Sequence, residues 1–437
     1  MAITSPPIIR RDLMIGSEQF ALVVQTVHDH GAAVATTAVH RQDFSRRIGG
    51  ARFELWPDDT RDPDTRLAEV ADLARTMSDK TLSVMIPADG QKSVVLCERS
   101  VFEDESKKAE VLACHIEVVR TADCGVIFGP DMENPESLQD RVSLVSGLRD
   151  HVTGLSEKCG GLSIDQRGYT AQGVVTGILE ALRWQASHVN GNGSRGGAWA
   201  GRRASIQGFG AVGANTALLL HERGIRVVAV SNKFGAYLAA GDAGLDVPAL
   251  VRAWQEGGDA AVHDLARRQR DTIRVEPDPN ALLDVPADIF VPAATRWVLA
   301  MPGEIEEVWR TENPGAYDVT QFLRRTGVQV IAEGANCPLT PDAEAYCQGQ
   351  GVAVLVDFII NCGGLIGCWR EWEARHEAGD GDVVLSVVHA RARAHIGEVV
   401  SANTIELLQA TQPVRRAADE IVRRNRGRLD DNGSPDR

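Results

Sequence analysis

The chain has 437 residues, enough for two or three domains of ordinary size, each with its own hydrophobic core. Hydrophobic residues make up 43% of the chain and charged residues 24%, a balance that favours a globular protein over a disordered one. The formal net charge of −14 argues against nonspecific binding to nucleic acid or to anionic membranes.

Targeting and metal-binding signals are missing from the sequence pattern. The longest apolar candidate, residues 352–369, is interrupted by Asp357 and Asn361, and it predicts no membrane span. The first eleven residues lack the apolar core of a secretory signal. The eight cysteines show no C-x-x-C spacing and the histidines no metal-ligand spacing. We therefore expect a cytoplasmic protein with reduced thiols and no metal.

Hydrophobic periodicity predicts alternating helices and extended segments in the first 160 residues. A stripe formed by Phe20, Val23, Val24 and Val27 predicts a helix over residues 12–31. The later elements, in chain order, are a strand over 32–39, an extended segment over 44–56, a helix over 60–80, extended sequence over 81–96 with a turn at 87–92, and helices over 106–121 and 138–155.

The second part of the chain predicts a long helix over 169–187, then a polar glycine loop at Asn190–Gly197 that is the best hinge candidate. Five short apolar runs follow that are typical of buried parallel strands: 204–207, 227–230, 287–292, 327–332 and 352–356. Strands alternating with helices predict an α/β fold with a doubly wound sheet. From Asn361 onwards the chain is helical, and residues 430–437 are expected to form a disordered tail.

One stretch predicts a dinucleotide site. Gly208, Gly210 and Gly213 form a G-x-G-x-x-G pattern between a strand and a helix, and a second apolar strand follows. Gly208 would make the tight turn, Gly210 would let the backbone approach a pyrophosphate, and Gly213 would let helix and strand pack closely. Phosphates would then bind the free N–H groups of the helix N-terminus, around Phe209, Ala211 and Val212. A glycine-rich turn in another α/β protein is the alternative.

Two lysines and one aspartate are candidates for chemistry. Lys80 ends a predicted helix, Lys92 follows a turn inside an apolar stretch, and Asp131 follows a proline. A buried lysine has a lowered pKa and can polarise a carbonyl or exchange protons with it. Taken singly, each has a structural alternative, because lysines near strand ends often snorkel to the surface and aspartates after proline often form turns.

Six blocks between Phe44 and Trp369 resemble the glutamate/leucine/phenylalanine/valine dehydrogenase family, in the family's order. They are Gly49-Gly50-Ala51-Arg52, Met77-Ser78-Asp79-Lys80, Pro87 to Lys92, Gly129-Pro130-Asp131-Met132, Ile331-Ala332-Glu333-Gly334-Ala335-Asn336 with Pro338, Thr340 and Pro341 after it, and Asn361-Cys362-Gly363-Gly364. The resemblance implies reversible oxidative deamination of an L-amino acid to a 2-oxo acid and ammonia. It also implies a closed homo-oligomer of unspecified size.

The resemblance assigns roles residue by residue. Lys92 would be the catalytic lysine, and Asp131 would shuttle protons and activate the attacking water. Lys80 would bind the substrate α-carboxylate, helped by backbone around Gly49 and Gly50. Three further sets of residues would orient the substrate amino group (Asn361), position the nicotinamide end (Thr170 and Asn336), and complete the cofactor site (Ala293).

The pocket positions favour an apolar substrate. Glutamate-specific members resemble Lys-Gly-Gly at the first block, where this chain has Ile48 before the two glycines, and they tend to carry serine where this chain has Cys368. These two side chains cannot hold a carboxylate, so glutamate is disfavoured. Gly129 and Leu365 resemble the phenylalanine branch more than the leucine branch. An aromatic amino acid is therefore our first hypothesis, with branched-chain amino acids and glutamate as alternatives.

The cofactor stays open between NAD and NADP. An acid at the end of the second dinucleotide strand would bind the ribose 2′-hydroxyl of NAD. This chain has Ser231, Asn232 and Lys233 there, which would accommodate a 2′-phosphate, unless Asn232 bonds the ribose of NAD and Lys233 points to solvent. The family's Gly-Gly-x-Lys is Asp89-Gly90-Gln91-Lys92 here, and a carboxylate beside Lys92 is expected to raise its pKa or to contact an unusual substrate.

The expected organisation has three parts. Residues 1–186 would form an α/β substrate and oligomerisation domain, and residues 187–360 a Rossmann domain. Residues 361–437 would form helices that pack back on the first domain, with the site in the cleft between domains. An alternative from another class is a cofactor-binding regulator without turnover, which the presence of Lys92 and Asp131 disfavours.

Overall fold

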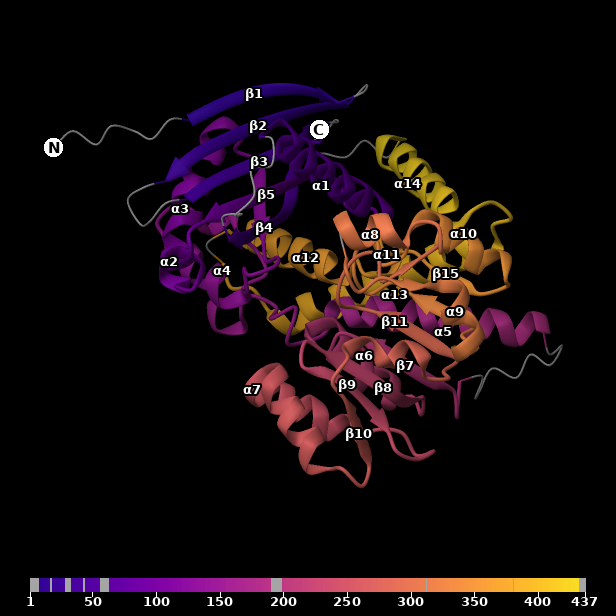
Figure 1. Ribbon diagram of the computed structural model, residues 1–437. Coiled ribbons are helices and arrows are strands. Elements are labelled where there is room, and N and C mark those ends of the chain that lie inside the picture. The colour runs from indigo at the N-terminus through magenta and orange to yellow at the C-terminus, as the bar shows by residue number, and fades with distance from the viewer. Residues whose placement is uncertain are drawn as a thin grey trace. The chain divides into compact units, whose positions relative to one another are not determined.

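The computed structural model describes residues 8–15, 18–27, 33–41, 44–55, 63–189, 199–311, 313–379 and 381–431. The predicted hinge loop at 190–197 and residues 432–437 of the predicted tail lie outside these ranges. Two compact units are present (Figure 1). The first takes its described residues from Met1–Ile164, Leu365–Ala392 and Val422–Arg437, and the second from Asp165–Gly364 and Arg393–Ile421. This division differs from the predicted boundaries, because residues 165–186, 361–364 and 393–421 belong to the second unit.

A six-stranded mixed sheet with the order β1-β2-β3-β5-β4-β6 forms the centre of the first unit (Figure 1). β1, β2, β3 and β5 pair antiparallel, whereas β4 runs parallel to both β5 and β6. The strands are β1 (Ile8–Ile15), β2 (Glu18–Val27), β3 (Ala33–Arg41), β4 (Arg47–Leu55), β5 (Asp89–Cys97) and β6 (Val126–Gly129).

The helix predicted over residues 12–31 is wrong, because the described part of this segment forms β1 and β2. Phe20 and Leu22 pack into one hydrophobic cluster and Val23 into another, so both faces of β2 are buried. A strand that is covered on both faces is apolar at nearly every position, and its pattern also contains matches to a helical period. The β-branched residues of this stretch, such as Val23, Val24 and Val27, were the signal that favours a strand.

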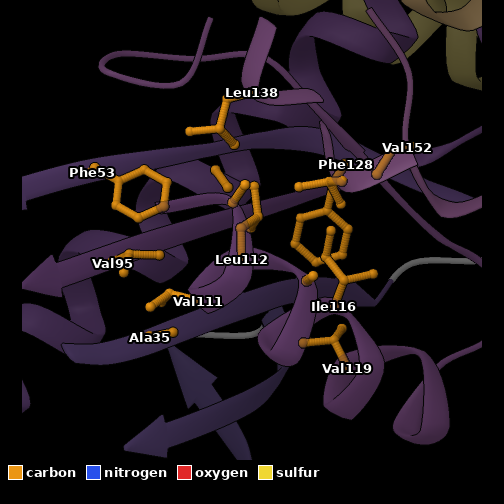
Figure 2. Close-up of a cluster of buried hydrophobic side chains, with 14 of the residues drawn as sticks. Ala35, Phe53, Val95, Val111, Leu112, Ile116, Val119, Phe128, Leu138 and Val152 are labelled. Carbon is orange, nitrogen blue, oxygen red and sulfur yellow. The ribbon is translucent and has the colours of Figure 1, made fainter. Parts of the chain in front are cut away.

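Two helices cover the opposite faces of this sheet. On one face, α3 (Glu105–Ala122) packs Leu112 and Ile116 against Phe53 and Phe128, as Figure 2 shows. On the other face, α1 (Pro63–Ser83) packs against a second cluster that includes Val94. Because side chains alternate along a strand, Lys92 lies on the same face as Val94, the face of α1. The sheet therefore places Lys92 beside the helix that carries Lys80.

The remaining helices of the first unit are short. The helix predicted over 138–155 ends early, because α4 covers only Glu136–Ser143 and Gly147 has a φ of +80°, which a helix cannot accommodate. The others are α2 (Arg99–Phe102) and the 3₁₀ turns η1 (Arg149–His151) and η2 (Glu157–Cys159).

A seven-stranded sheet with the order β10-β9-β8-β7-β11-β14-β15 forms the centre of the second unit (Figure 1). β8, β7, β11, β14 and β15 are parallel, and β9 and β10 add an antiparallel edge. This arrangement confirms the doubly wound α/β fold. The strands are β7 (Arg203–Gln207), β8 (Arg226–Asn232), β9 (Gly235–Ala239), β10 (Ile273–Glu276), β11 (Ile289–Pro292), β14 (Val330–Ala332) and β15 (Ala353–Leu355), and a separate pair is formed by β12 (Leu299–Ala300) and β13 (Tyr317–Asp318).

Helices connect these strands and form the C-terminal part of the chain. Those of the second unit are α5 (Tyr169–Val189), α6 (Ala211–His221), α7 (Val247–Arg268), the 3₁₀ turn η3 (Pro279–Asp284), α8 (Ile305–Thr311), α9 (Val319–Thr326), α10 (Pro341–Gly349) and α11 (Asp357–Ile360). The C-terminal helices α12 (Gly363–Ala378), α13 (Leu385–Gln409) and α14 (Val414–Asp431) each contribute residues to both units. In the described part of the chain, we find no helix that combines the length and the apolar character of a membrane span.

Candidate active site

Paired glycines make close backbone contacts where β4 lies between β5 and β6. β4 pairs with β5 at Ile48 and again at Ala51, and Gly49 and Gly50 fall between these two points. A Cβ atom on Gly49 would lie 1.7 Å from the carbonyl oxygen of Gln91, and one on Gly50 would lie 2.8 Å from Cβ of Asp131. Both positions therefore require glycine, and Gly50 leaves room for the Asp131 side chain.

Lys92 and Asp131 form a direct ion pair beside Gly50. The Lys92 side chain is 8% exposed and that of Asp131 is 13% exposed, so both charges are held largely out of water. The backbone N–H of Met132 donates to Oδ1 of Asp131 at 2.8 Å and fixes the carboxylate. The structure thus brings together the two residues that were predicted to be catalytic.

Arg52 is a third charged group at this point, and the sequence interpretation gave it no role. Its Nε lies 3.6 Å from Oδ2 of Asp131, and this Nε is buried without a hydrogen-bond partner. Arg52 follows Gly50 by two residues, so alternation along β4 turns both toward the same face of the sheet. Its place in the Gly49-Gly50-Ala51-Arg52 block and this alternation were the signals that could have identified Arg52 from the sequence.

The three charges shift one another's protonation. Burial lowers the pKa of Lys92, and the positive charges of Arg52 and Lys80 lower it further, while Asp131 opposes the shift. For Asp131, burial acts to raise the pKa, but the positive charges of Lys92 and Arg52 outweigh it and the pKa is lowered. A lysine with a lowered pKa next to an ionised carboxylate is suited to proton transfer near neutral pH.

Lys80 lies in the last turn of α1, as predicted. Helix α1 packs directly on β5, because a Cβ on Gly90 would lie 2.1 Å from the carbonyl oxygen of Ala74. The hydroxyl of Ser78 accepts the Gly90 N–H at 2.7 Å and fixes this contact. The close packing sets the position of the Lys80 backbone relative to Lys92, and the Lys80 charge acts on the Lys92 pKa.

The unusual residues before Lys92, Asp89 and Gln91, make hydrogen bonds to the backbone. Asp89 lies at the start of β5, where its Oδ2 accepts the backbone N–H of Phe44 at 3.3 Å. Gln91 is fully buried, and its Nε2 donates to the carbonyl oxygen of Gly49 at 2.8 Å. Burial lowers the pKa of Lys92, and Asp131 is the carboxylate that forms an ion pair with it.

The residues predicted to select the substrate are apolar or small. Ile48 is 1% exposed, and Gly129 pairs with Gly50 across β4 and β6. The Sγ of Cys368 lies 3.7 Å from the position that a Cβ on Gly129 would take, so the structure brings these two residues together. Leu365 precedes Cys368 by three residues in α12, so the two share a face of that helix.

A buried carboxylate holds this part of α12 in place. Glu371 accepts the backbone N–H groups of Leu155 at 3.2 Å and Leu162 at 2.9 Å, and the Thr153 hydroxyl donates to the Cys368 carbonyl at 2.6 Å. Burial raises the pKa of Glu371, and the hydrogen bonds to its carboxylate oppose the increase. This network positions Cys368, and its members are too far apart in the sequence to have been predicted.

The glycine motif of the second unit, which was predicted to bind a pyrophosphate, combines a tight turn with open space at the start of α6. Gly208 has a φ of +91°, which favours glycine, and a Cβ on Gly213 would lie 1.8 Å from the Gly208 carbonyl oxygen. No atom lies within 4 Å of a Cβ built on Gly210, so space is open there. Helix α6 starts at Ala211 with no side-chain cap on its N–H groups. Open space beside uncapped N–H groups fits a dinucleotide phosphate.

At the end of β8 the three predicted cofactor residues differ in availability. Ser231 is buried and Lys233 is exposed. Asn232 Oδ1 accepts the backbone N–H of Phe234 at 2.9 Å and the hydroxyl of Tyr237 at 2.8 Å, and its Nδ2 donates to the carbonyl of Asp259. Because Asn232 is engaged inside the unit, Lys233 is the better candidate to meet the adenosine ribose.

The residues assigned to the substrate amino group (Asn361), to the nicotinamide end (Thr170 and Asn336) and to the rest of the cofactor site (Ala293) belong to the second unit. Asn361 Nδ2 faces Oδ1 of Asn336 at 3.2 Å, and its own Oδ1 is buried without a partner. A Cβ on Gly363 would lie 3.1 Å from Cα of Thr170. The Ala293 backbone lies against Gly208. No group of three or more potential ligands among the described residues is arranged to hold a metal.

Comparison with known proteins agrees with this geometry. The sequence model of the Glutamate/Leucine/Phenylalanine/Valine dehydrogenase family matches residues 160–403. The chain belongs to this family. It is therefore an NAD(P)-dependent amino acid dehydrogenase, as the resemblance implied.

The relatives that are most similar in sequence include glutamate dehydrogenases. The NADP-specific glutamate dehydrogenase of Saccharolobus shibatae is 28% identical over 352 residues, 78% of this chain and 71% of that protein. Glutamate dehydrogenase A2 of Halobacterium salinarum is 28% identical over 351 residues, 77% of this chain and 71% of that protein. These relatives do not support a specific placement in the phenylalanine/leucine branch.

Solved structures share the fold. The hetero-hexameric glutamate dehydrogenase of Thermus thermophilus, in its Leu-bound form, is 22% identical with a TM-score of 0.65 and covers 98% of this chain and 89% of its own. The L-tryptophan dehydrogenase of Nostoc punctiforme is 20% identical with a TM-score of 0.58 and covers 93% of this chain and 96% of its own. At these identities the likeness concerns the fold alone.

Proposed function

We propose that this dehydrogenase acts on an apolar L-amino acid, with an aromatic side chain favoured, and converts it reversibly to the 2-oxo acid and ammonia. The single observation that carries the proposal is the buried Lys92–Asp131 pair beside Gly50, with fully buried Ile48 on the same face of β4. The charged pair supports the deamination chemistry, and Ile48 supports an apolar substrate side chain.

Substrate binding and the first proton transfer would use two lysines of the first unit. Lys80 would bind the α-carboxylate, and the backbone around Gly49 and Gly50 would complete its position. Lys92, with its lowered pKa, would accept a proton from the substrate ammonium, because only the neutral amine donates a hydride from Cα easily. The unpartnered Oδ1 of Asn361 would accept a hydrogen bond from the substrate amino group.

Proton transfer in the second half of the reaction would use the same pair. After hydride loss, the substrate is an imine, and Asp131 would remove a proton from the water that attacks it. Lys92 would stabilise the resulting carbinolamine, and Asp131 would return the proton to its nitrogen. As the C–N bond breaks and ammonia leaves, the again ionised Asp131 would take the proton of the carbinolamine hydroxyl, so that the C=O bond of the 2-oxo acid forms. Arg52 keeps Asp131 ionised between these steps, because its positive charge lowers the Asp131 pKa.

The dinucleotide, when bound, accepts the hydride from Cα at its nicotinamide. We propose that the phosphates bind at Gly208, Phe209, Gly210, Ala211, Val212 and Gly213. Thr170 and Asn336 would hold the nicotinamide end, Ala293 would complete the cofactor site, and Lys233, next to Ser231 and Asn232, would meet the adenosine ribose. With Asn232 engaged internally and no carboxylate among these three, NADP fits at least as well as NAD.

The choice of substrate follows from what surrounds the expected side-chain position. Ile48, Gly129 and Cys368 offer no positive charge to a distal carboxylate, and an unpaired buried carboxylate costs several kcal/mol. The absence of a side chain at Gly129 leaves more room than a larger residue would. A methylene group or two changes discrimination by only about 1–3 kcal/mol, so branched-chain amino acids remain the second candidate.

Two further alternatives have weaker support. Glutamate is favoured by the relatives that are glutamate dehydrogenases and disfavoured by Ile48 and Cys368. A cofactor-binding regulator without turnover is disfavoured by the intact Lys92–Asp131 pair. The glutamate dehydrogenase of Thermus thermophilus is a hetero-hexamer, and we propose a homo-oligomer for this chain without assigning its size.

The test is a substrate panel with both cofactors. Reduction of NAD⁺ and NADP⁺ is followed by near-ultraviolet absorbance with L-phenylalanine, L-tryptophan, L-leucine, L-valine and L-glutamate. We expect turnover with an aromatic substrate that is lost in Lys92→Ala and Asp131→Asn. Turnover with glutamate alone would overturn the interpretation of Ile48. Dinucleotide binding without any turnover would favour the regulator.

A further inference from the structure

A second charged cluster, separate from the Lys92–Asp131 pair, contacts the turn that carries Asn336. Three carboxylates, those of Glu333, Glu344 and Asp357, are each at most 2% exposed and surround the guanidinium of Arg415. Arg415 lies in the first turn of α14, beyond residue 403, where the family match ends. The cluster therefore joins the turn around Gly334 and Asn336 to the start of α14, which lies beyond the residues that the family model matches.

Arg415 contacts all three carboxylates at once. Its Nη1 donates to Oδ1 of Asp357 at 2.7 Å, its Nη2 to Oε2 of Glu333 at 3.2 Å, and its Nε to Oε2 of Glu344 at 3.1 Å. The start of α14 is itself fixed, because the Val414 N–H donates to the side chain of Gln348 at 3.0 Å. A planar guanidinium with five N–H donors suits this shared role, which an ammonium group cannot reproduce.

The balance of charge makes Arg415 necessary to this arrangement. Burial raises the pKa of Glu333 well above its usual value, and the neighbouring carboxylates Glu344 and Asp357 add to the increase, while Arg415 opposes it. The pKa of Arg415 is correspondingly raised, since three negative groups stabilise its charged form against the effect of burial. Without the guanidinium, two or three buried carboxylates would face one another with no positive charge among them.

The same carboxylates hold the backbone of the turn. The Asp357 N–H donates to Oε2 of Glu333 at 2.9 Å, and the Cys337 N–H donates to Oδ2 of Asp357 at 2.9 Å. Cys337 has a φ of +46°, which a residue other than glycine adopts only when its surroundings impose it. The turn from Gly334 to Cys337 is thus tied at both ends to groups that Arg415 binds.

That turn carries Asn336, which is proposed to receive the nicotinamide end, and it contacts Asn361, which is proposed to bind the substrate amino group. Asn361 Nδ2 donates to the carbonyl oxygen of Gly334 at 3.3 Å and to Oδ1 of Asn336 at 3.2 Å. The backbone N–H groups of Gly334 and Ala335 donate to the carbonyl of Pro292, which precedes Ala293. A displacement of the turn would therefore move Asn336 and Asn361 together.

We infer that Arg415 is a positioning residue for dinucleotide binding: by neutralising Glu333, Glu344 and Asp357, it holds the Gly334–Cys337 turn in the conformation that receives the nicotinamide end. The inference rests on the proposed roles of Asn336 and Asn361. It assigns a function to the start of α14, and it predicts that dinucleotide affinity depends on a residue that does not touch the dinucleotide.

The test measures dissociation constants for NAD⁺ and NADP⁺ by fluorescence titration without amino acid. Arg415→Met is expected to weaken binding by about 5- to 150-fold, the range of a typical coupling between sites. The matched control is Arg416→Met, which removes an exposed arginine from the next position of α14 and is expected to bind as the wild type does. At saturating dinucleotide, the Michaelis constant for the amino acid is expected to rise as well, because Asn361 moves with the turn.

A rescue variant separates charge balance from general loss of structure. Arg415→Met with Glu344→Gln removes one negative charge along with the positive one, so it is expected to recover much of the lost affinity and to fold if Arg415→Met alone does not. Wild-type affinity in Arg415→Met, or a double variant no better than the single one, would overturn the inference. A wild-type protein that binds neither dinucleotide would instead refute the proposed cofactor site.

Discussion

Replacement of Arg52 by methionine is expected to move the pH dependence of the reaction to higher pH. The Arg52 Nε lies 3.6 Å from Oδ2 of Asp131, and the Arg52 side chain is only 17% exposed. A positive charge within 4–6 Å lowers a carboxyl pKa by about 1–3 units. Since Lys92 already pairs with Asp131, we expect the lower end, about one unit or about 1.4 kcal/mol.

Both catalytic groups shift in the same direction. Loss of the Arg52 charge raises the pKa of Asp131, which must be ionised, and that of Lys92, which must be neutral to accept the substrate proton. The rising limb of kcat/KM against pH for oxidative deamination therefore moves up by about one unit. Because the groups are coupled, the limb reports the pair and not either residue alone.

Two control variants make this measurement specific. Arg47→Met removes an arginine of the same strand that pairs with Asp123 at 3.2 Å, and it is expected to leave the profile in place. Arg52→Lys keeps the positive charge and is expected to stay within a few tenths of a unit of the wild type. An unchanged profile in Arg52→Met, or a shift to lower pH, would refute the electrostatic argument.

Three further predictions concern positions that the structure constrains. In Gly50→Ala the new Cβ would lie 2.8 Å from Cβ of Asp131, so we expect kcat to fall by about 100-fold through misplacement of the carboxylate, and normal kcat would contradict this. Gly210→Ala should weaken dinucleotide binding at an unchanged melting temperature, because no atom lies within 4 Å of its Cβ. Gly213→Ala should instead destabilise the fold by about 1–3 kcal/mol, because its Cβ would lie 1.8 Å from a carbonyl oxygen. Equal behaviour of the two variants in calorimetry and titration would be evidence against the phosphate site. Ile48→Lys should raise kcat/KM for L-glutamate relative to L-phenylalanine, and a ratio that stays constant would show that position 48 does not contact the substrate side chain.

Local patterns explain why parts of the fold could be predicted. The three glycines at 208, 210 and 213 and the strand and helix around them lie within about 30 residues, so their geometry follows from short-range sterics. The helix predicted over 12–31 was wrong, because β2 is buried by clusters on both of its faces, and such a strand loses the alternation that identifies it.

Long-range contacts explain what the sequence could not show. Lys92 and Asp131 could be proposed from a family resemblance, but the contribution of Arg52 depends on how three parallel strands are paired. Arg415 and Glu333 are 82 residues apart, and no local pattern connects them. Asn232 has the residue type expected at a ribose site, yet its hydrogen bonds lie inside the unit.

The central claim is that this amino acid dehydrogenase prefers an apolar substrate, and a direct competition tests it. Equal concentrations of L-phenylalanine and L-glutamate are incubated with the enzyme and both oxidised dinucleotides, and the 2-oxo acids are quantified by mass spectrometry. The ratio of initial product formation equals the ratio of kcat/KM values. The structure predicts an excess of phenylpyruvate, because Ile48 and Cys368 provide no charge for a distal carboxylate. An excess of 2-oxoglutarate would contradict the account.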